Sequence, residues 1–346
     1  MTKQLTAIGS YIFAGGFTIG VEESFKVLAH MEGGPYGVKT FKLNRPEIPV
    51  YQLPTPWPWE QYKGVNFIYA NPPCSPFSVA GRSIYYGKDN WRTDPRMACH
   101  DHCFELAYNL NPDAYCVESV PAAFTRGREL FDRRAEEAMS SGYAVTHLLE
   151  DARYFGIPQK RKRYMFIAHK HELVMANRNW QPPVPLLPFL NDLPEAGFFS
   201  PFKDPAKLEL VKHTPQGRGT RGTWLELNPD QDKWQRSATG VKGRPRFCEY
   251  RAAPDRPMGA YIGNFVIHPT EHRFLGLEEV KAFCGFPHDW KFHDERKAFS
   301  EIARGVLPPV GAWVARSIAQ AILSGARATP SVRVLDLSEP LSVNND

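Results

Sequence analysis

The stretch Val65-Asn-Phe-Ile-Tyr-Ala-Asn-Pro-Pro-Cys-Ser-Pro76 joins a short apolar run directly to a loop with three prolines in five positions. An apolar run bounded in this way is typical of a buried strand. Because prolines stiffen the backbone, we expect them to hold Cys74 at the carboxyl edge of the strand instead of in the core. A thiol there can act as a nucleophile if its surroundings lower its pKa from about 8.5. Taken alone, however, a cysteine in a proline-rich turn is more often a small apolar residue.

The segments around this strand alternate between strand-like and helix-like patterns over roughly the first half of the chain. Strand-like runs cover residues 6–14, 114–118 and 164–168, and helix-compatible runs cover 20–29 and 100–110. Strands that alternate with helices predict an α/β fold, a mostly parallel sheet with helices on both faces. Ligands of such folds bind beyond the carboxyl ends of the strands, where the Cys74 loop is expected.

Length and composition limit the classes of protein that fit. The chain has 346 residues, of which 42% are hydrophobic and 23% charged, so about two globular domains are expected and general disorder is excluded. No apolar stretch approaches the roughly 20 residues that span a bilayer, and the first residues do not resemble a secretion signal. Six scattered cysteines do not form a disulfide framework. We therefore expect a cytoplasmic protein with reduced thiols and no membrane partner.

The composition changes after residue 171. Residues 181–188 contain four prolines, cannot form a regular helix, and are expected to be a linker. Residues 212–256 contain ten Lys or Arg against five acids, with aromatic residues interleaved, which fits either a polyanion-binding surface or a solvated loop. Helix-compatible patterns return at 277–283 and 310–323. The last twenty residues are polar and are expected to be frayed.

The run Cys99-His-Asp-His-Cys103 resembles a metal cluster at first sight. If the segment is helical, the two cysteines share one face, whereas His100 and His102 point elsewhere. No second pair of ligands lies at zinc-like spacing. We therefore expect core cysteines and no metal.

Seven short motifs follow one another along the chain: Phe13-Ala-Gly-Gly-Phe17; Glu32 with Tyr36, Thr40, Phe41 and Asn44; Pro72-Pro-Cys-Ser-Pro-Phe-Ser78; Val117-Glu-Ser-Val120; Phe155-Gly-Ile-Pro-Gln-Lys-Arg-Lys-Arg163; His268-Pro269 to Arg273 with Gly285-Phe-Pro287; and Gly305-Val-Leu-Pro-Pro309. In this order they resemble the motifs of the DNA cytosine-C5 methyltransferases. The Pro-Cys loop and the Gln-x-Arg-x-Arg run are both intact, so the resemblance is specific and extends over nearly the whole catalytic framework.

The resemblance implies a Rossmann-like class I methyltransferase sheet with a smaller target recognition domain. On this basis we expect residues 1–170 to form the catalytic domain and 171–263 the recognition domain. Residues 264–326 would complete the catalytic domain, and 327–346 would be a flexible tail. The implied partner is double-stranded DNA, bound by a monomer, in a prokaryotic or phage restriction–modification setting.

The resemblance also implies a catalytic mechanism. Cytosine C5 becomes nucleophilic when a thiolate adds to C6, and Cys74 would supply that thiolate. Glu118 would face N3 and the N4 amino group, and one or both of Arg161 and Arg163 would hold O2 and lower the thiol pKa. The target base must leave the helical stack to reach such a site.

Further residues are expected to contact the substrate or the cofactor, S-adenosyl-L-methionine. Expected substrate contacts are Ser75, Pro76, Phe77, Ser78, Gln159, Arg244 and Arg246. Expected cofactor contacts are Phe13, Ala14, Gly15, Gly16, Glu32, Gly33, Gln52, Asn71, Pro72 and Val306, with Glu32 accepting hydrogen bonds from the ribose hydroxyls.

The chain departs from the family mainly on the cofactor side. The glycine loop is two residues shorter, and Gly33 replaces the bulky residue that follows the acid. Other departures are Tyr51-Gln-Leu53 in place of Gly-Asp-Ile, Val306 in place of asparagine, Ser119 in place of the asparagine of Glu-Asn-Val, and Ser75 in place of glutamine. These changes suggest a cofactor pocket of altered shape, which binds S-adenosyl-L-methionine weakly or accepts a modified donor with a larger group.

Two alternatives remain open at this point. One is a catalytically silent relative that binds DNA, which the altered cofactor loop favours and the intact Cys74 and Glu118 oppose. The other is an RNA cytosine-C5 methyltransferase on the same fold. A free nucleotide substrate would leave the basic segment unexplained.

Overall fold

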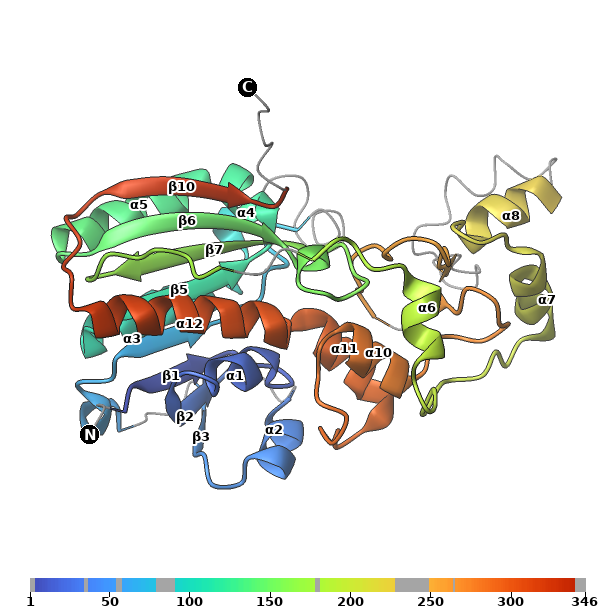
Figure 1. The fold of residues 1–346 in the computed structure, drawn as a ribbon, viewed down its shortest axis with the longest axis horizontal. Helices are drawn as coiled ribbons and strands as arrows, with labels where there is room; N and C mark the ends of the chain where they lie inside the picture. Colours follow the sequence, from blue (N-terminus) through green and yellow to red (C-terminus); the bar gives the residue numbers. More distant parts are fainter. Residues whose placement is uncertain are drawn as a thin grey trace.

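An eight-stranded sheet forms the centre of the larger lobe in the computed structural model, which describes residues 4–33, 37–53, 58–78, 91–177, 181–227, 249–263 and 265–339 (Figure 1). The strand order is β10-β6-β7-β5-β4-β1-β2-β3. β7 runs antiparallel to both of its neighbours, and the other neighbouring pairs are parallel. The strands span β1 (Thr6–Ser10), β2 (Lys26–Glu32), β3 (Val50–Gln52), β4 (Phe67–Ala70), β5 (Ala114–Ser119), β6 (Ala144–Asp151), β7 (Lys162–His169) and β10 (Val332–Leu337).

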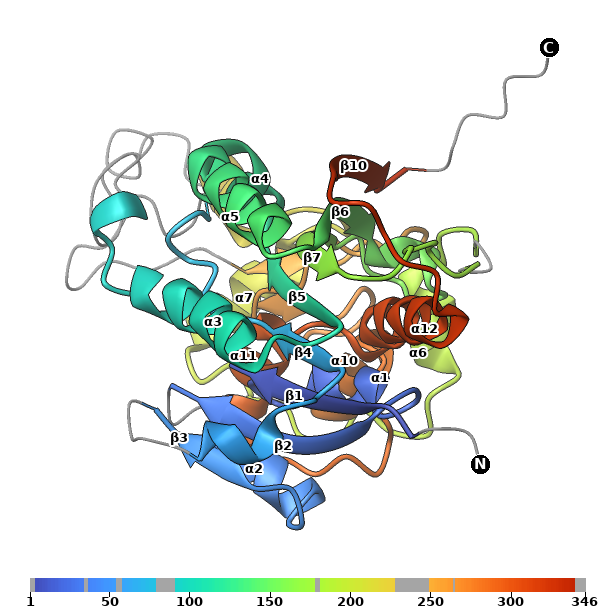
Figure 2. The same ribbon diagram turned by 90° about the vertical axis from the view of Figure 1, so that its left-hand side faces the viewer.

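Helices cover both faces of this sheet, as the sequence predicts (Figure 2). One face carries α1 (Gly16–Val21) and α12 (Pro308–Ser324), and the other carries α3 (Met97–Leu110), α4 (Pro121–Arg126) and α5 (Arg128–Ser140). α2 (Val38–Asn44) extends the first of these layers, and the 3-10 turns are η1 (Trp59–Tyr62), η2 (Trp91–Thr93) and η3 (Ala152–Tyr154).

β4 is apolar throughout, and both of its faces are buried. In β4, Phe67 and Tyr69 belong to the core beneath α1 and α12, whereas Ile68 and Ala70 belong to the core beneath α3 and α5. Side chains alternate between the two faces of a strand, so each face needs its own apolar set. The continuous apolar run at residues 65–70 therefore lies in the middle of the sheet.

A smaller lobe follows β7 and lies beyond one end of the sheet, at the right of Figure 1. Arg251 holds part of it together, because its buried guanidinium donates to the carbonyl oxygens of Val211 (2.7 Å), Thr214 (2.8 Å) and His268 (2.9 Å). The elements of this part are α6 (Leu186–Asn191), α7 (Pro205–His213), α8 (Thr220–Leu227), β8 (Tyr250–Arg251) and β9 (Val266–Ile267), followed by α10 (Leu277–Phe283) and α11 (Glu295–Arg304), which pack toward α12. The helices expected at 277–283 and 310–323 are confirmed, and the domain boundaries stay a prediction.

The expectation of a frayed tail is wrong for residues 332–337. They form β10, which pairs in parallel with β6 from Val332 opposite Val145 to Leu337 opposite Glu150. This strand, Val-Arg-Val-Leu-Asp-Leu, is itself mostly apolar, but it lies within an otherwise polar tail. As an edge strand it pairs on one side only and is largely exposed. Residues 340–346 lie outside the described part.

The expected linker at 181–188 also needs a correction, because α6 begins inside it at Leu186. Pro188 is the third residue of this helix. The first amides of a helix have no intrahelical partner, so a proline in the first turn costs no hydrogen bond.

No single helix in the described ranges is both long and apolar enough to cross a membrane. By length and composition alone, α11 and α12 pass that test as a pair bent by 42°.

Candidate active site

The Cys74 loop follows β4 and is held in a compact turn. The amides of Phe77 (3.1 Å) and Ser78 (3.2 Å) both donate to the carbonyl oxygen of Cys74. The Phe77 ring is fully buried against Trp91, His100 and Phe131. Cys74 itself stays partly exposed at the carboxyl edge of the sheet, as expected. Phe77 therefore anchors the loop with its buried ring, and its expected contact with the substrate stays a prediction.

Glu118 lies beside this loop because β4 and β5 are parallel neighbours. Ala70 is opposite Val117, so Asn71 and Glu118, which come next on the two strands, are neighbours. The side-chain nitrogen Nδ2 of Asn71 donates to Oε2 of the buried Glu118 carboxylate. Asn71 thus contacts Glu118, and its expected contact with the cofactor stays a prediction.

Arg163 completes this group from β7. Its Nε lies 2.8 Å from Oε1 of Glu118, and both side chains are largely buried. β7 is antiparallel to β5, with Met165 opposite Glu118, so the start of β7 reaches the carboxyl end of β5. Asn71, Glu118 and Arg163 therefore meet at one edge of three neighbouring strands, next to Cys74.

Burial dominates the electrostatics of the two candidate catalytic groups. It raises the pKa of Glu118, while the nearby charges of Arg163 and Arg161 lower it. Burial likewise raises the pKa of the Cys74 thiol, with a further rise from Glu118 and an opposing effect of the two arginines. The arginines act in the expected direction, but burial outweighs them. The pKa of the Cys74 thiol therefore lies above its usual value.

Gln159 and Arg161 are engaged by the protein backbone. The buried guanidinium of Arg161 donates to the carbonyl oxygens of Tyr261, Ala303 and Gly305, each at 2.9 Å. Oε1 of Gln159 accepts from the amide of Tyr261 at 3.0 Å. These two side chains connect the segment just before β7 to Tyr261 and Gly305, which lie about 100 residues or more further along the chain. Of the two arginines, Arg163 is the one that pairs with Glu118.

Arg96 is a site residue that the motif analysis missed. It donates to Oγ of Ser75, the residue after Cys74, at 2.7 Å, and to Oδ1 of Asp94 at 2.8 Å. The hydrogen bonds with Arg96 lower the pKa of the Asp94 carboxyl. The short spacing Asp94-Pro-Arg96 directly before α3 is the signal that could have found it. This ion pair fixes the position of the nucleophile loop.

Most of the residues expected at the cofactor follow or end β1, β2 and β3, whereas Asn71 and Pro72 follow β4. A side chain at Gly16 would overlap the carbonyl oxygen of Val306, so these two expected residues are neighbours. Glu32 ends β2, is buried, and accepts from the amide of Gly33 at 3.1 Å. Gln52 lies opposite Glu32 on β3 and donates to its carbonyl oxygen at 2.9 Å. Tyr36, Arg244 and Arg246 lie outside the described residues.

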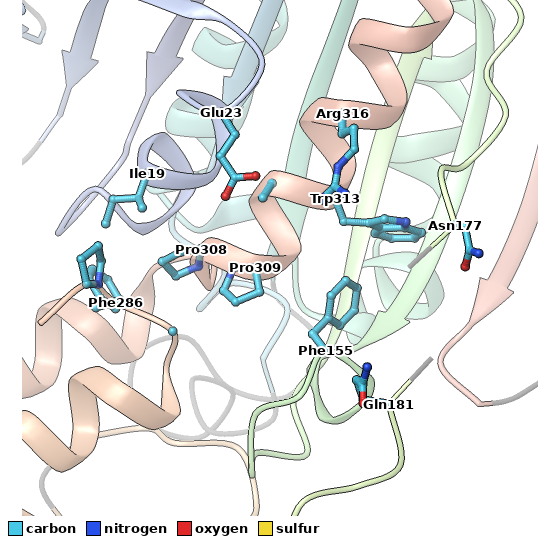
Figure 3. Close-up of a pocket in the computed structure, with 13 residues that line it drawn as sticks. Ile19, Glu23, Phe155, Asn177, Gln181, Phe286, Pro308, Pro309, Trp313 and Arg316 are labelled. Carbon is cyan, nitrogen blue, oxygen red and sulfur yellow. The ribbon is translucent and has the colours of Figure 1, made fainter. Parts of the chain in front are cut away.

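A pocket of about 570 Å³ between α1 and α12 is separate from this group (Figure 3). Its walls include Ile19 of α1, Glu23 shortly after that helix, and Trp313 and Arg316 of α12. The ring of Phe155, which packs on Trp313, also lines it. None of Cys74, Glu118, Arg163 or Glu32 lines it. The remaining lining residues are Asn177, Gln181, Gly285, Phe286, Pro287, Pro308, Pro309 and Ala312.

Metal ligands are not gathered at this site. Within the described ranges, no three His, Cys, Asp or Glu side chains lie close enough together to hold an ion. The run from Cys99 to Cys103 lies in α3, where Cys103 is buried and Nε2 of His100 lies 3.2 Å from the carbonyl oxygen of Pro73. His100 thus supports the nucleophile loop.

The alkylation rate of Cys74 is expected to rise about tenfold per pH unit between about pH 6.5 and about pH 8.5, because only the thiolate reacts. The pKa of Cys74 lies above its usual value, so the rate should not level off in this range. Glu118→Gln removes a negative charge from beside the thiol and should react at least as fast as the wild type. The measurement is iodoacetamide labelling, followed by mass spectrometry of the Cys74 peptide. A plateau below about pH 7.5, or slower labelling of the Glu118→Gln variant, would contradict this account.

Comparison with known proteins gives one family and a consistent set of relatives. The family model described as C-5 cytosine-specific DNA methylase matches residues 11–321. The chain is 25% identical over 338 residues to type II methyltransferase M1.HphI of Haemophilus parahaemolyticus, covering 92% of this chain and 87% of that protein. It is 24% identical to type II methyltransferase M.NgoMIV of Neisseria gonorrhoeae, covering 92% and 98%.

Solved structures show the same fold. A putative DNA modification methyltransferase encoded within an Escherichia coli prophage superposes with a TM-score of 0.64 at 20% identity, covering 92% of this chain and all of that one. The methyltransferase EhMeth of Entamoeba histolytica superposes with a TM-score of 0.63 at 15% identity, covering 93% and 99%.

Proposed function

The chain belongs to the C-5 cytosine-specific DNA methylase family, and from that premise we propose that it transfers a methyl group from S-adenosyl-L-methionine to C5 of a cytosine in double-stranded DNA. The observation that carries the proposal is the meeting of Cys74, Glu118 and Arg163 at one sheet edge, with the 2.8 Å Arg163–Glu118 contact at its centre. A binding module has no use for a partly exposed thiol beside a buried carboxyl group.

Cys74 and Glu118 divide the chemistry on the base. The Cys74 sulfur, after losing its proton to solvent, forms a bond to C6, and the ring electrons move toward C5. Glu118 donates a proton to N3, which offsets the charge that builds on the ring. Because burial raises the pKa of Glu118, its protonated form is favoured more than for an exposed carboxyl group. A bound donor would supply the methyl group to C5 and leave as S-adenosylhomocysteine. The N3 proton would return to Glu118, and loss of the C5 proton to water with breakage of the S–C6 bond would restore the ring.

The basic residues around this pair hold and orient the base. Arg163 lies against Glu118 and is the candidate to hold O2, while Arg161 braces β7 through backbone carbonyl oxygens. Arg96 and Asp94 hold the loop through Ser75. A flipped base costs a few kcal/mol of lost stacking, which phosphate contacts must offset. The basic segment at 212–256 is the candidate for those contacts, and its residues 228–248 lie outside the described part.

The cofactor side fits an adenosine-bearing group. Glu32 is a buried carboxylate at the end of β2, suited to accept hydrogen bonds from two ribose hydroxyls, and Gln52 lies beside it. Gly15 (φ 91°) and Gly16 turn the chain tightly next to Val306. When bound, S-adenosyl-L-methionine supplies the electrophilic methyl group. The short glycine loop and Gly33 keep one alternative to methyl transfer open, namely a modified sulfonium donor that carries a larger group.

The test is mass spectrometry of nucleosides from double-stranded DNA incubated with the protein and the donor. The expected product is 5-methyldeoxycytidine from reactions with S-adenosyl-L-methionine. A heavier modified cytosine that forms only with an extended sulfonium donor would replace the methyl proposal by the modified-donor alternative. Unmodified DNA with every donor, together with unchanged DNA binding, would support a silent relative, and modified cytosine in structured RNA alone would overturn the DNA assignment.

A further inference from the structure

Tyr11 is an aromatic residue in a strained conformation at the end of β1. Its φ of 54° lies in the left-handed region, which bulky residues rarely adopt. Phe13, two residues later, has φ 50°, and only one further non-glycine residue in the described ranges, Asn111, shares this conformation. Such strain persists where the surrounding structure enforces it, and it gathers at functional sites.

The surroundings of Tyr11 explain how this conformation is held. Its amide donates to the carbonyl oxygen of Met31 in β2 at 2.9 Å. Its ring packs edge-on against His102 of α3, with 6.2 Å between the ring centroids. Its hydroxyl group lies close to the Cys99 side chain, which contributes to the raised pKa of Tyr11 after the larger effect of burial. The ring is therefore fixed between β2 and α3.

The ring of Tyr11 also covers Gly33. A Cβ atom built on Gly33 would overlap the ring and would lie 3.1 Å from the hydroxyl oxygen. No side chain fits at position 33 unless Tyr11 moves. Glu32, the residue before Gly33, raises the pKa of Tyr11 through its charge, after the larger effects of burial and the two cysteines. The aromatic surface next to Glu32 thus comes from the β1–α1 loop and not from the end of β2.

We propose that Tyr11 forms the wall of the donor site next to Glu32, and that Tyr11 and Gly33 together determine how tightly the adenosine part of the donor is held. This inference rests on the proposed function, because it takes the donor to be an adenosine derivative. Tyr11 is a positioning and specificity residue here and takes no part in the chemistry. Its rigid placement costs little ordering entropy when the ligand binds, which favours affinity.

The experiment is calorimetric binding of S-adenosylhomocysteine, which needs no turnover, to the full chain and its variants. An aromatic contact of ordinary strength predicts that Tyr11→Leu weakens binding by about three- to tenfold, whereas Tyr11→Phe changes it by less than about twofold. Tyr143→Leu is the matched control, because Tyr143 is equally buried but bonds to Pro112 and Asn111 at the far end of β5. It should lower the melting temperature and leave the affinity unchanged.

The double variant Tyr11→Ala/Gly33→Phe tests the pairing and keeps the proposal testable even if Tyr11→Leu fails to fold. Gly33→Phe alone should weaken binding, because its side chain meets Tyr11, but in the Tyr11→Ala background it should restore affinity. Additive effects of the two substitutions, or equal affinities of the Tyr11→Leu and Tyr143→Leu variants, would overturn the inference alone. A wild type that does not bind S-adenosylhomocysteine would instead overturn the proposed cofactor.

Discussion

Replacing Cys74 by serine is expected to lower the rate of methyl transfer by more than about a thousandfold and to change DNA affinity by less than about twofold. A serine hydroxyl is a far weaker nucleophile toward C6 at neutral pH, so the first bond of the reaction does not form. The loop itself should survive, because the bonds from Phe77 and Ser78 go to the backbone carbonyl of residue 74 and not to its side chain.

The measurement combines nucleoside mass spectrometry with trapping on DNA that contains 5-fluorocytosine, which retains the S–C6 bond after transfer. Wild-type protein should form a denaturation-resistant adduct, and the Cys74→Ser variant should form none. Cys116→Ala is a suitable control, since it removes a buried thiol from the neighbouring strand β5 and should still form the adduct. Measurable turnover by Cys74→Ser, or adduct formation at another cysteine, would show that position 74 is not the nucleophile.

The parts of the site that the sequence predicts well are those set by strand order. Cys74 and Glu118 each follow or end an apolar run, and parallel neighbours bring their carboxyl ends to one edge. Glu32 and Gln52 meet for the same reason on β2 and β3. The local sequence pattern is therefore enough to predict a contact when the two residues lie at the ends of neighbouring parallel strands.

The parts that the sequence misses depend on contacts between distant segments. Arg161 has the spacing of a catalytic residue, yet its guanidinium is bound by carbonyl oxygens 100 to 144 residues away, which no local pattern reveals. Gly33 looks like the loss of a bulky side chain, whereas the ring of Tyr11 occupies that space. β10 was missed because its six residues lie within an otherwise polar tail and become a strand through edge pairing with β6. In each case the partner lies in a different element.

The direction of the Cys74 pKa shift is a further property that the sequence motifs do not predict. The two arginines favour the thiolate, as their proximity suggests, but the depth of the site favours the neutral thiol more strongly. The same burial raises the pKa of Glu118. Burial therefore favours the protonated form of both groups, and for Glu118 this agrees with the proposed role as a proton donor.

The second large effect is expected for Glu118→Gln, which should lower the rate of transfer by about a hundred- to ten-thousandfold. Glutamine keeps the size of the side chain and can still accept a hydrogen bond from Asn71, but it cannot give a proton to N3. DNA binding and Cys74 alkylation should persist in this variant, so the defect would lie after thiol activation.

Glu118→Gln could also lower activity only by destabilising the fold, because it breaks the buried pair with Arg163. Breaking such a pair lowers the free energy of unfolding by about 3–5 kcal/mol. Glu279→Gln is the matched control, because Glu279 is also buried and pairs with Arg273 at 2.8 Å, away from the nucleophile loop. Both variants should melt at a lower temperature, but only Glu118→Gln should lose transfer per folded molecule. If the two variants lose activity in the same proportion, Glu118 acts by holding the fold together and not by protonating the base. If instead only Glu118→Gln fails, the carboxyl group at the end of β5 is the acid that makes addition of the Cys74 sulfur possible.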